Sequence, residues 1–157
     1  MWKRPDEPPV DGLDENGYMN ALRLYRIARW LHLLGIPVLP RIIQKLNFVL
    51  TRCVVPYTCT IGNGAELAYG GVAVVIHDRA VIGDRVMIGP CVTIGGRAGH
   101  HAVPIIKHDV FIGTGAKVLG PIVIGEQAII GANAVVLHSV NPRETVVGVP
   151  ARVKPRT

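Results

Sequence analysis

Aliphatic residues recur at every sixth position through the C-terminal two thirds of this chain. They form one run of four and, after a gap of twelve residues, a second run in the same phase: Ile76, Ile82, Ile88 and Ile94, then Ile106, Ile112, Val118, Ile124, Ile130 and Val136. A period of six matches neither the 3.6-residue period of a helix nor the two-residue period of a strand. It is the signature of a β-solenoid, in which each hexad forms one side of a coil and the aliphatic side chains stack along the axis.

A second apolar position and two interruptions add detail to this pattern. The second position lies four residues after most of the first and holds Ala80, Val86, Val92, Val110, Ala116, Ile122, Ala128 and Ala134. The step from Leu67 to Ile76 is nine residues, so it carries three extra residues. The segment from Gly96 to Val103 is also irregular, and we expect it to be a loop that leaves the coil. Loops on a rigid scaffold commonly carry function.

The first fifty residues have a different pattern. Residues 1–13 are expected to be a loose tail, and Asp14 is a plausible helix cap. The predicted first helix places four apolar residues on one face and ends at Gly35: Leu24, Ile27, Leu31 and Leu34. A second short helix is predicted after Pro40. We therefore divide the chain into a tail and helical segment, residues 1–52, and a β-helix acyltransferase domain, residues 53–157.

Composition limits the functional classes. The net charge of +6 favours an anionic partner. The basic residues on the predicted helices fit docking against the solenoid end or a sister subunit, and they also fit peripheral contact with an anionic membrane. Nothing indicates a nucleic-acid partner. The three cysteines lack paired spacing, which argues against a disulfide framework or a metal site. No signal peptide or membrane span is evident, so a cytoplasmic protein is expected.

Three of the six histidines cluster at the interruptions and are the candidates for chemistry. His77 follows inward-facing Ile76, so its side chain should point out of the core, and His100 and His101 lie in the expected loop. Residues about eighteen apart stack in a solenoid, which should make His77 a neighbour of that loop. Imidazole titrates near neutral pH and suits a general base. His77 is our choice of base, with His101 or His100 as helper.

Four sequence blocks carry a resemblance to a known family. They are Tyr69-Gly70-Gly71 with Val75-Ile76-His77, then Val92 to Gly96, then Ile112 to Gly120, and finally Val147 to Arg152. Together they resemble the serine O-acetyltransferase branch of the hexapeptide-repeat acyltransferases. The resemblance implies a left-handed parallel β-helix, a homotrimer, and acetyl-CoA in a groove between subunits. It also implies backbone contacts to the pantetheine arm near Gly95, Gly96, Thr114 and Ala132, with Arg152 and Lys154 near the nucleotide phosphates.

Departures from this branch concern the acceptor. The enzymes of cysteine biosynthesis carry an Asp-His pair where this chain has Ala68-Tyr69, and a carboxylate where it has Val54. What looks similar instead is a shorter branch with Tyr-Gly-Gly and Val-Ile-His in these places. Acetyl-CoA use is therefore expected, with L-serine as acceptor by resemblance. A sugar or sugar-nucleotide hydroxyl is the alternative acceptor.

Other classes remain as alternatives. A hexapeptide-repeat carbonic anhydrase gathers three histidines on zinc and pairs two of its ligands five residues apart, a spacing that no histidine pair has here. A non-catalytic β-helix scaffold would be recognised by its failure to release thiol from acetyl-CoA. Covalent catalysis through Cys91 is disfavoured, because no basic residue is evident beside it. We expect direct acetyl transfer without a metal.

Overall fold

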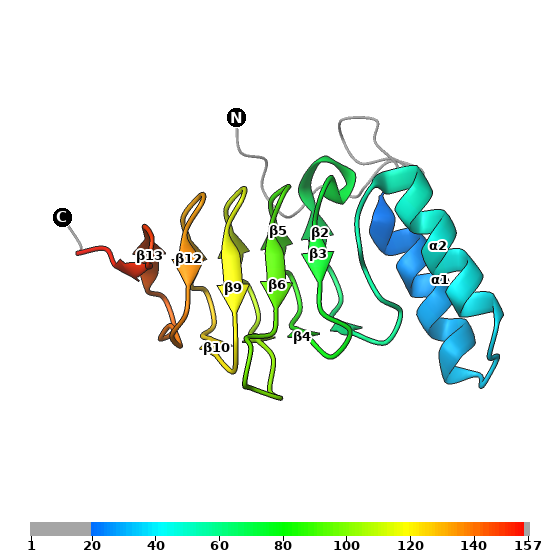
Figure 1. Cartoon of the computed structure of the whole chain (residues 1–157). Coiled ribbons are helices and arrows are strands. Elements are labelled where there is room, and N and C mark those ends of the chain that lie inside the picture. Colours follow the sequence, from blue (N-terminus) through cyan, green and yellow to red (C-terminus); the bar gives the residue numbers. More distant parts are fainter. Residues whose placement is uncertain (1–19, 156–157) are drawn as a thin grey trace.

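A pair of helices and a parallel β-helix make up the protein (Figure 1). The structure, a computed structural model, describes residues 20–155. Helix α1 spans Ala21–Leu33 and helix α2 spans Leu39–Thr51. The helices lie side by side at one end of the solenoid, and β13 lies near the other (Figure 1). Within residues 20–155, neither helix is long and apolar enough to cross a membrane.

Three parallel sheets form the sides of the solenoid. The first contains β1 (Thr60–Ile61), β4 (Val81–Ile82), β7 (Ile105–Ile106) and β10 (Val123–Ile124). The second contains β2 (Glu66–Leu67), β5 (Met87–Ile88), β8 (Phe111–Ile112), β11 (Ile129–Ile130), β13 (Thr145–Val147) and the antiparallel β14 (Arg152–Val153). The third contains β3 (Val75–Ile76), β6 (Thr93–Gly95), β9 (Lys117–Leu119) and β12 (Val135–Val136). Successive strands turn from one sheet to the next, so about four coils stack. The parallel β-helix predicted from the hexads is confirmed.

The register shows where the two interruptions lie. Ile112 pairs with Ile130, eighteen residues later, which is one regular coil of three hexads. Leu67 pairs with Ile88, 21 residues later, because the coil includes the irregular turn Ala68–Gly71. Ile94 pairs with Val118, 24 residues later, because the segment after Gly95 leaves the coil. Both irregular segments are where the hexad count places them.

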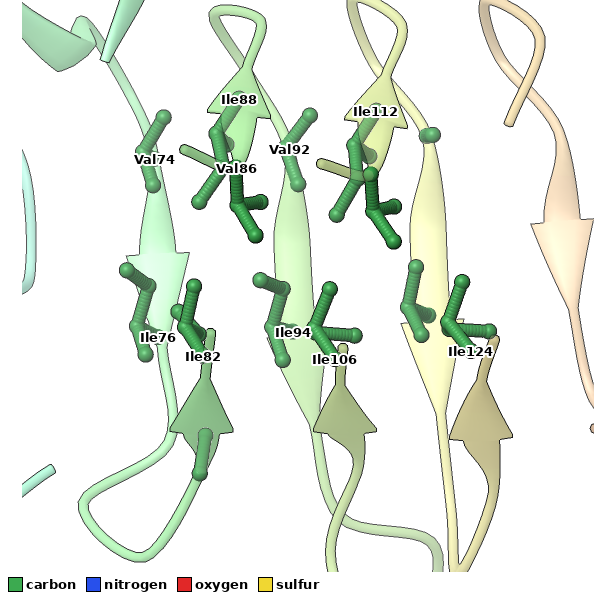
Figure 2. Close-up of a cluster of buried hydrophobic side chains, with 14 of the residues drawn as sticks. Val74, Ile76, Ile82, Val86, Ile88, Val92, Ile94, Ile106, Ile112 and Ile124 are labelled. Atoms are coloured by element: carbon green, nitrogen blue, oxygen red, sulfur yellow. The ribbon is translucent and has the colours of Figure 1, made fainter. Parts of the chain in front are cut away.

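The core is a column of aliphatic layers. Every residue of the two hexad runs is at most 2% exposed, and the second apolar positions are at most 5% exposed. Figure 2 shows Ile82, Ile106 and Ile124 from successive coils lying in line. Burial of stacked aliphatic surface drives this fold, and the hexads supply it coil after coil. Cys59 is fully buried in the same core, as its place in the repeat predicts.

The face of the first helix was predicted only in part. Leu31 is buried as expected, but Ile27 and Leu34 are 50% and 58% exposed. The buried residues of the helix are Ala21, Leu22, Tyr25, Ala28 and Leu31, and the first three of them join the core of the solenoid. The helix is capped by Asn20, whose side chain accepts from the N–H of Leu22; Asp14 lies outside the described residues. Two hydrogen bonds fix which side of α1 packs on the solenoid. The buried Tyr25 hydroxyl donates to the Cys59 carbonyl at 2.8 Å and accepts from the Ile61 N–H at 3.1 Å. The second helix is confirmed.

Candidate active site

His77 lies where a corner of the coil meets the loop of the next coil. It directly follows β3, and its N–H donates to the carbonyl of Ile94 at 2.8 Å. Its side chain is 30% exposed. The Cδ2 and Nε2 atoms of the ring both lie 3.7 Å from the point where a Cβ on Gly96 would stand. The structure therefore brings His77 and the start of the loop together, as the stacking of residues eighteen apart predicts.

Two groups contact the Nδ1 atom of His77. The backbone N–H of Arg79 donates a hydrogen bond to Nδ1 at 3.2 Å. Oδ1 of Asp78 lies 2.6 Å from the same nitrogen, where the carboxylate can form an ion pair with the ring once the ring is protonated. The Nε2 atom is the ring nitrogen that faces Gly96.

Asp78 is the residue that the sequence analysis missed. Its carboxylate is 59% exposed, so its attraction to the imidazole is screened by water. What it contributes is orientation of the ring and a negative charge beside the imidazolium that forms when the ring takes up a proton. The signal was present in the sequence, because an acidic residue directly follows the candidate base.

The loop histidines are exposed. His100 closes a turn, donating its N–H to the carbonyl of Arg97 at 3.0 Å. No hydrogen bond or ion pair within residues 20–155 joins the imidazole of His100 or His101 to His77. The helper role for either histidine stays a prediction.

Thr114 and Ala132 lie on one corner of the solenoid, in adjacent coils. A Cβ added to Gly89 would stand 2.7 Å from the backbone nitrogen of Thr114, and one added to Gly113 would stand 2.7 Å from that of Ala132. The coils pack backbone to backbone here, which only glycine allows. We call this column the Thr114 corner. It presents small exposed side chains, which leave the main chain open to a narrow ligand.

Two cations lie where the Thr114 corner reaches the end of the solenoid. Val147 in β13 stacks against Gly131, the neighbour of Ala132, with its Cγ1 2.7 Å from the added Cβ position. Arg152 in β14 pairs with Val147 across the two strands. Arg152 and Lys154 are both exposed. One line along the solenoid thus contains three of the residues predicted to contact acetyl-CoA: Thr114 and Ala132 for the pantetheine arm, and Arg152 for the phosphates. Lys154 lies two residues after Arg152 in the chain.

Gly95 and Gly96 belong to a different corner. Gly95 ends β6, and its carbonyl accepts from the N–H of Gly120 at 3.0 Å. Strand β9, three residues long and so about 10 Å at 3.3 Å per residue, and the turn before it separate Gly120 from Thr114. Within one chain, the structure places His77 with Gly95 and Gly96, but it places Thr114 and Ala132 at the opposite end of the same sheet.

Within residues 20–155, the structure shows which side chains could serve metal or thiol chemistry. Among residues 20–155, no group of three or more His, Cys, Asp or Glu side chains is placed to hold a metal ion. Cys53 and Cys59 are buried and Cys91 is exposed, and all three are free thiols. The Cys91 carbonyl accepts from the ammonium of Lys117 at 2.7 Å. The structure therefore places a basic residue beside Cys91, which the sequence analysis did not expect, and the Lys117 ammonium bonds the backbone carbonyl of Cys91.

Known proteins resemble this chain in sequence and in fold. Residues 104–138 match the family described as bacterial transferase hexapeptide (six repeats). The serine acetyltransferase of Synechococcus elongatus is 40% identical over 135 residues, which cover 85% of this chain and 55% of the relative. The serine acetyltransferase of Bacillus subtilis is 39% identical over 137 residues, 86% of this chain and 63% of the relative.

Solved structures give the same result. The serine acetyltransferase from Brucella abortus in complex with coenzyme A has a TM-score of 0.81 at 34% identity, covering 85% of this chain and 54% of that one. The enzyme from Neisseria gonorrhoeae in complex with serine has a TM-score of 0.78 at 36% identity, covering 84% and 54%. The chain spans about half the length of the curated relatives it matches. In its repeat, its fold and these likenesses, the chain is similar to the hexapeptide-repeat acyltransferases, and to the serine acetyltransferases among them.

Proposed function

We propose that the chain is an acetyl-CoA-dependent O-acetyltransferase that acts on a small hydroxyl acceptor, with L-serine as the first candidate. The observation that carries the proposal is the position of the His77 imidazole, whose Nε2 faces Gly96 and whose Nδ1 lies 2.6 Å from the Asp78 carboxylate. An alcohol is far too weak an acid to ionise at neutral pH, so its attack on a thioester needs such a base. The relatives' names supply the reaction class.

The residues imply a direct transfer. Nε2 of His77 takes the acceptor hydroxyl proton as the oxygen bonds to the thioester carbonyl carbon. The oxyanion that forms is stabilised by a backbone N–H at Gly96, because Gly95 still belongs to strand β6. Collapse breaks the carbon–sulfur bond, and the leaving thiolate takes the proton back from the imidazolium. Neither a metal nor an acyl-enzyme is part of this sequence.

The arrangement of the two corners favours a homotrimer. Acetyl-CoA that lies along the Thr114 corner, with its phosphates near Arg152 and Lys154, is one strand length away from His77 of the same chain. In a cyclic trimer, that corner can face the His77 corner of the neighbouring subunit. The thioester then reaches a base that its own subunit does not supply. The domain proposed for this chemistry is residues 53–157, and its location is cytoplasmic, where acetyl-CoA is available.

A sugar or sugar-nucleotide hydroxyl is the second candidate acceptor. Val54, which pairs with Val75 beside His77, and Ala68 supply no carboxylate for the ammonium group of serine. The test is thiol release from acetyl-CoA over a panel of L-serine, free sugars and sugar nucleotides. Release with serine alone supports the first acceptor, and release with a sugar alone supports the second. The absence of release with every member would make the chain a scaffold and end the proposal.

A contact of the N-terminal helices with a membrane surface is a separate proposal, and its evidence lies in the helix pair rather than in this site.

A further inference from the structure

Helix α2 buries polar side chains and exposes apolar ones. Its buried residues are Pro40, Asn47 and Thr51. On the opposite side, Ile42, Leu46 and Val49 are 55%, 48% and 59% exposed. A helix that only packs against its own domain shows the reverse arrangement. The outward face of α2 is therefore built for contact with something other than this chain's core.

The orientation of α2 is fixed by specific hydrogen bonds. The Asn47 amide donates to the carbonyl of Ala21 at 3.0 Å and so ties α2 to α1. The Thr51 hydroxyl donates to the Asn47 carbonyl at 2.7 Å and lies 2.8 Å from Sγ of Cys53. Rotating the helix to bury its apolar residues would break these buried bonds, and each buried group left without a partner is costly. The outward face therefore stays outward.

The exposed apolar surface is continuous. Val38, Ile42, Leu46 and Val49 are spaced by three or four residues and form one stripe along α2. We call these four residues the α2 stripe. Leu33 and Leu34, 71% and 58% exposed, add apolar surface at the end of α1, shortly before α2 begins. Exposed apolar patches of this kind on a folded protein mark contact sites.

Charge identifies the partner. The segment 21–52 contains five arginines and one lysine, and it contains no aspartate or glutamate. Lys45 lies three residues from Ile42 and four from Val49, so it flanks the α2 stripe directly, and Arg41 adjoins it one turn earlier. An apolar stripe with cations on its flank matches helices that lie in the headgroup region of an anionic bilayer. A symmetric contact between two copies would instead bring these cations together with no acid in the segment to pair them.

We propose that the α2 stripe and its flanking cations dock the protein on an anionic lipid surface. The stripe lies at the acyl boundary, and the side chains of Arg41 and Lys45 reach the lipid phosphates. The contact is peripheral, because α2 has only thirteen residues. Val54, just after α2, pairs with Val75 in β3, the strand that precedes His77. The docking face and the candidate base therefore belong to the same end of the molecule.

The experiment is flotation of the full chain with two kinds of vesicle, phosphatidylcholine alone and the same lipid with phosphatidylglycerol. We expect binding to the anionic vesicles that weakens as salt is raised. A cation beside an anionic surface strengthens binding about fivefold, so Arg41→Gln with Lys45→Gln should weaken it by about 25-fold. Ile42→Ser with Leu46→Ser should weaken it at least about tenfold.

Matched controls come from the solenoid. Lys107→Gln with Arg143→Gln removes two exposed cations elsewhere, and Ile129→Ser removes a comparably exposed aliphatic side chain. These variants should bind as the wild type does, and circular dichroism should show all variants folded. Equal binding to both kinds of vesicle, or no binding, overturns the proposal. It is also overturned if the α2 variants bind the anionic vesicles as tightly as the wild type does. A third contrary outcome is that the variants keep their vesicle binding but have a lower particle mass than the wild type in light scattering, which would assign the stripe to a contact between copies.

Discussion

Adding a single methyl group at Gly96 tests the direction in which the base points. The Cβ of a Gly96→Ala variant would stand 3.7 Å from both Cδ2 and Nε2 of His77 and 3.9 Å from Cγ1 of Val103. All three are ordinary van der Waals distances, so nothing in the fold has to move. The methyl group nevertheless occupies the space in front of the nitrogen that should take the acceptor's proton.

The expected effect separates stability from activity. Because no contact is compressed, the free energy of unfolding should change by less than about 0.5 kcal/mol, a Tm shift below about 2 °C for a chain of this size. The acceptor oxygen must come within roughly 2.6–3.2 Å of Nε2 to be deprotonated. A methyl group beside that position displaces the oxygen by about 1 Å, and a misplacement of this size can cost about 10²-fold in rate. We expect kcat/KM for the acceptor to fall by about 10- to 100-fold.

The assay is thiol release from acetyl-CoA with varied acceptor, together with a thermal melt of each variant. Ala98→Val, which adds bulk to an exposed position of the same loop, is the control and should keep both activity and Tm. Full activity in Gly96→Ala at an unchanged Tm would show that the acceptor does not bind in front of Nε2. The assignment of the base would then be wrong.

The remaining predictions concern other parts of the structure. Asp78→Asn should lower kcat about fivefold, because an exposed carboxylate contributes only about 1 kcal/mol to holding the imidazole. Asp78→Glu should recover part of the loss, and an unchanged kcat in Asp78→Asn would remove the positioning role of Asp78. Ala132→Trp should weaken acetyl-CoA binding in calorimetry while the Tm is unchanged, and an unaltered affinity would move the ligand away from the Thr114 corner. Tyr25→Phe leaves the Cys59 carbonyl and the Ile61 N–H without their partner, and the free energy of unfolding in urea should fall by about 1–3 kcal/mol for each group. An unchanged free energy of unfolding would show that the hydroxyl does not make these buried bonds. Burial raises the pKa of Tyr25 from 10.0 to about 12 and that of Cys59 from 9.0 to about 12. Both groups therefore contribute stability that is present below pH 9 and is lost as the pH rises to 12, and a Tm that stays level over this range would contradict the burial of both groups.

The solenoid was predictable because its rule is local. Each hexad places one residue inward whatever the neighbouring coils do, so phase alone locates Ile82, Ile112 and Ile130 in the core. The same counting locates both interruptions, and it places Thr114 and Ala132, eighteen residues apart, on one corner.

The helices were less predictable because their faces depend on distant partners. An apolar stripe through Ile27 and Leu34 exists in the sequence, but the side of α1 that packs on the coil is the one that carries Tyr25, whose hydroxyl finds two backbone partners there. No periodicity encodes that bond. The orientation of α2 follows from Asn47 in the same way, since the amide reaches a carbonyl of α1.

The candidate site was predictable in its residues but not in its arrangement. The sequence singles out His77 as a departure from the repeat, and eighteen-residue stacking brings it to the loop. It does not reveal that Asp78 turns back onto the ring, because this depends on the side-chain rotamers at the corner. Nor does hexad phase reveal that His77 and Thr114 lie at opposite ends of one sheet until coils are assigned to sheets.

The most direct test of the account is the turnover of the His77→Ala variant with L-serine and acetyl-CoA, measured as thiol release and as acetylated product by mass spectrometry. The account predicts release by the wild type that depends on the acceptor, and a loss of about 10²-fold or more in the variant, the usual scale for losing a general base. It also predicts that no stable acetyl-protein accumulates and that Cys91→Ala keeps its activity. Near-full turnover in His77→Ala, with activity abolished in His101→Ala, would contradict it and give the role to the loop histidine.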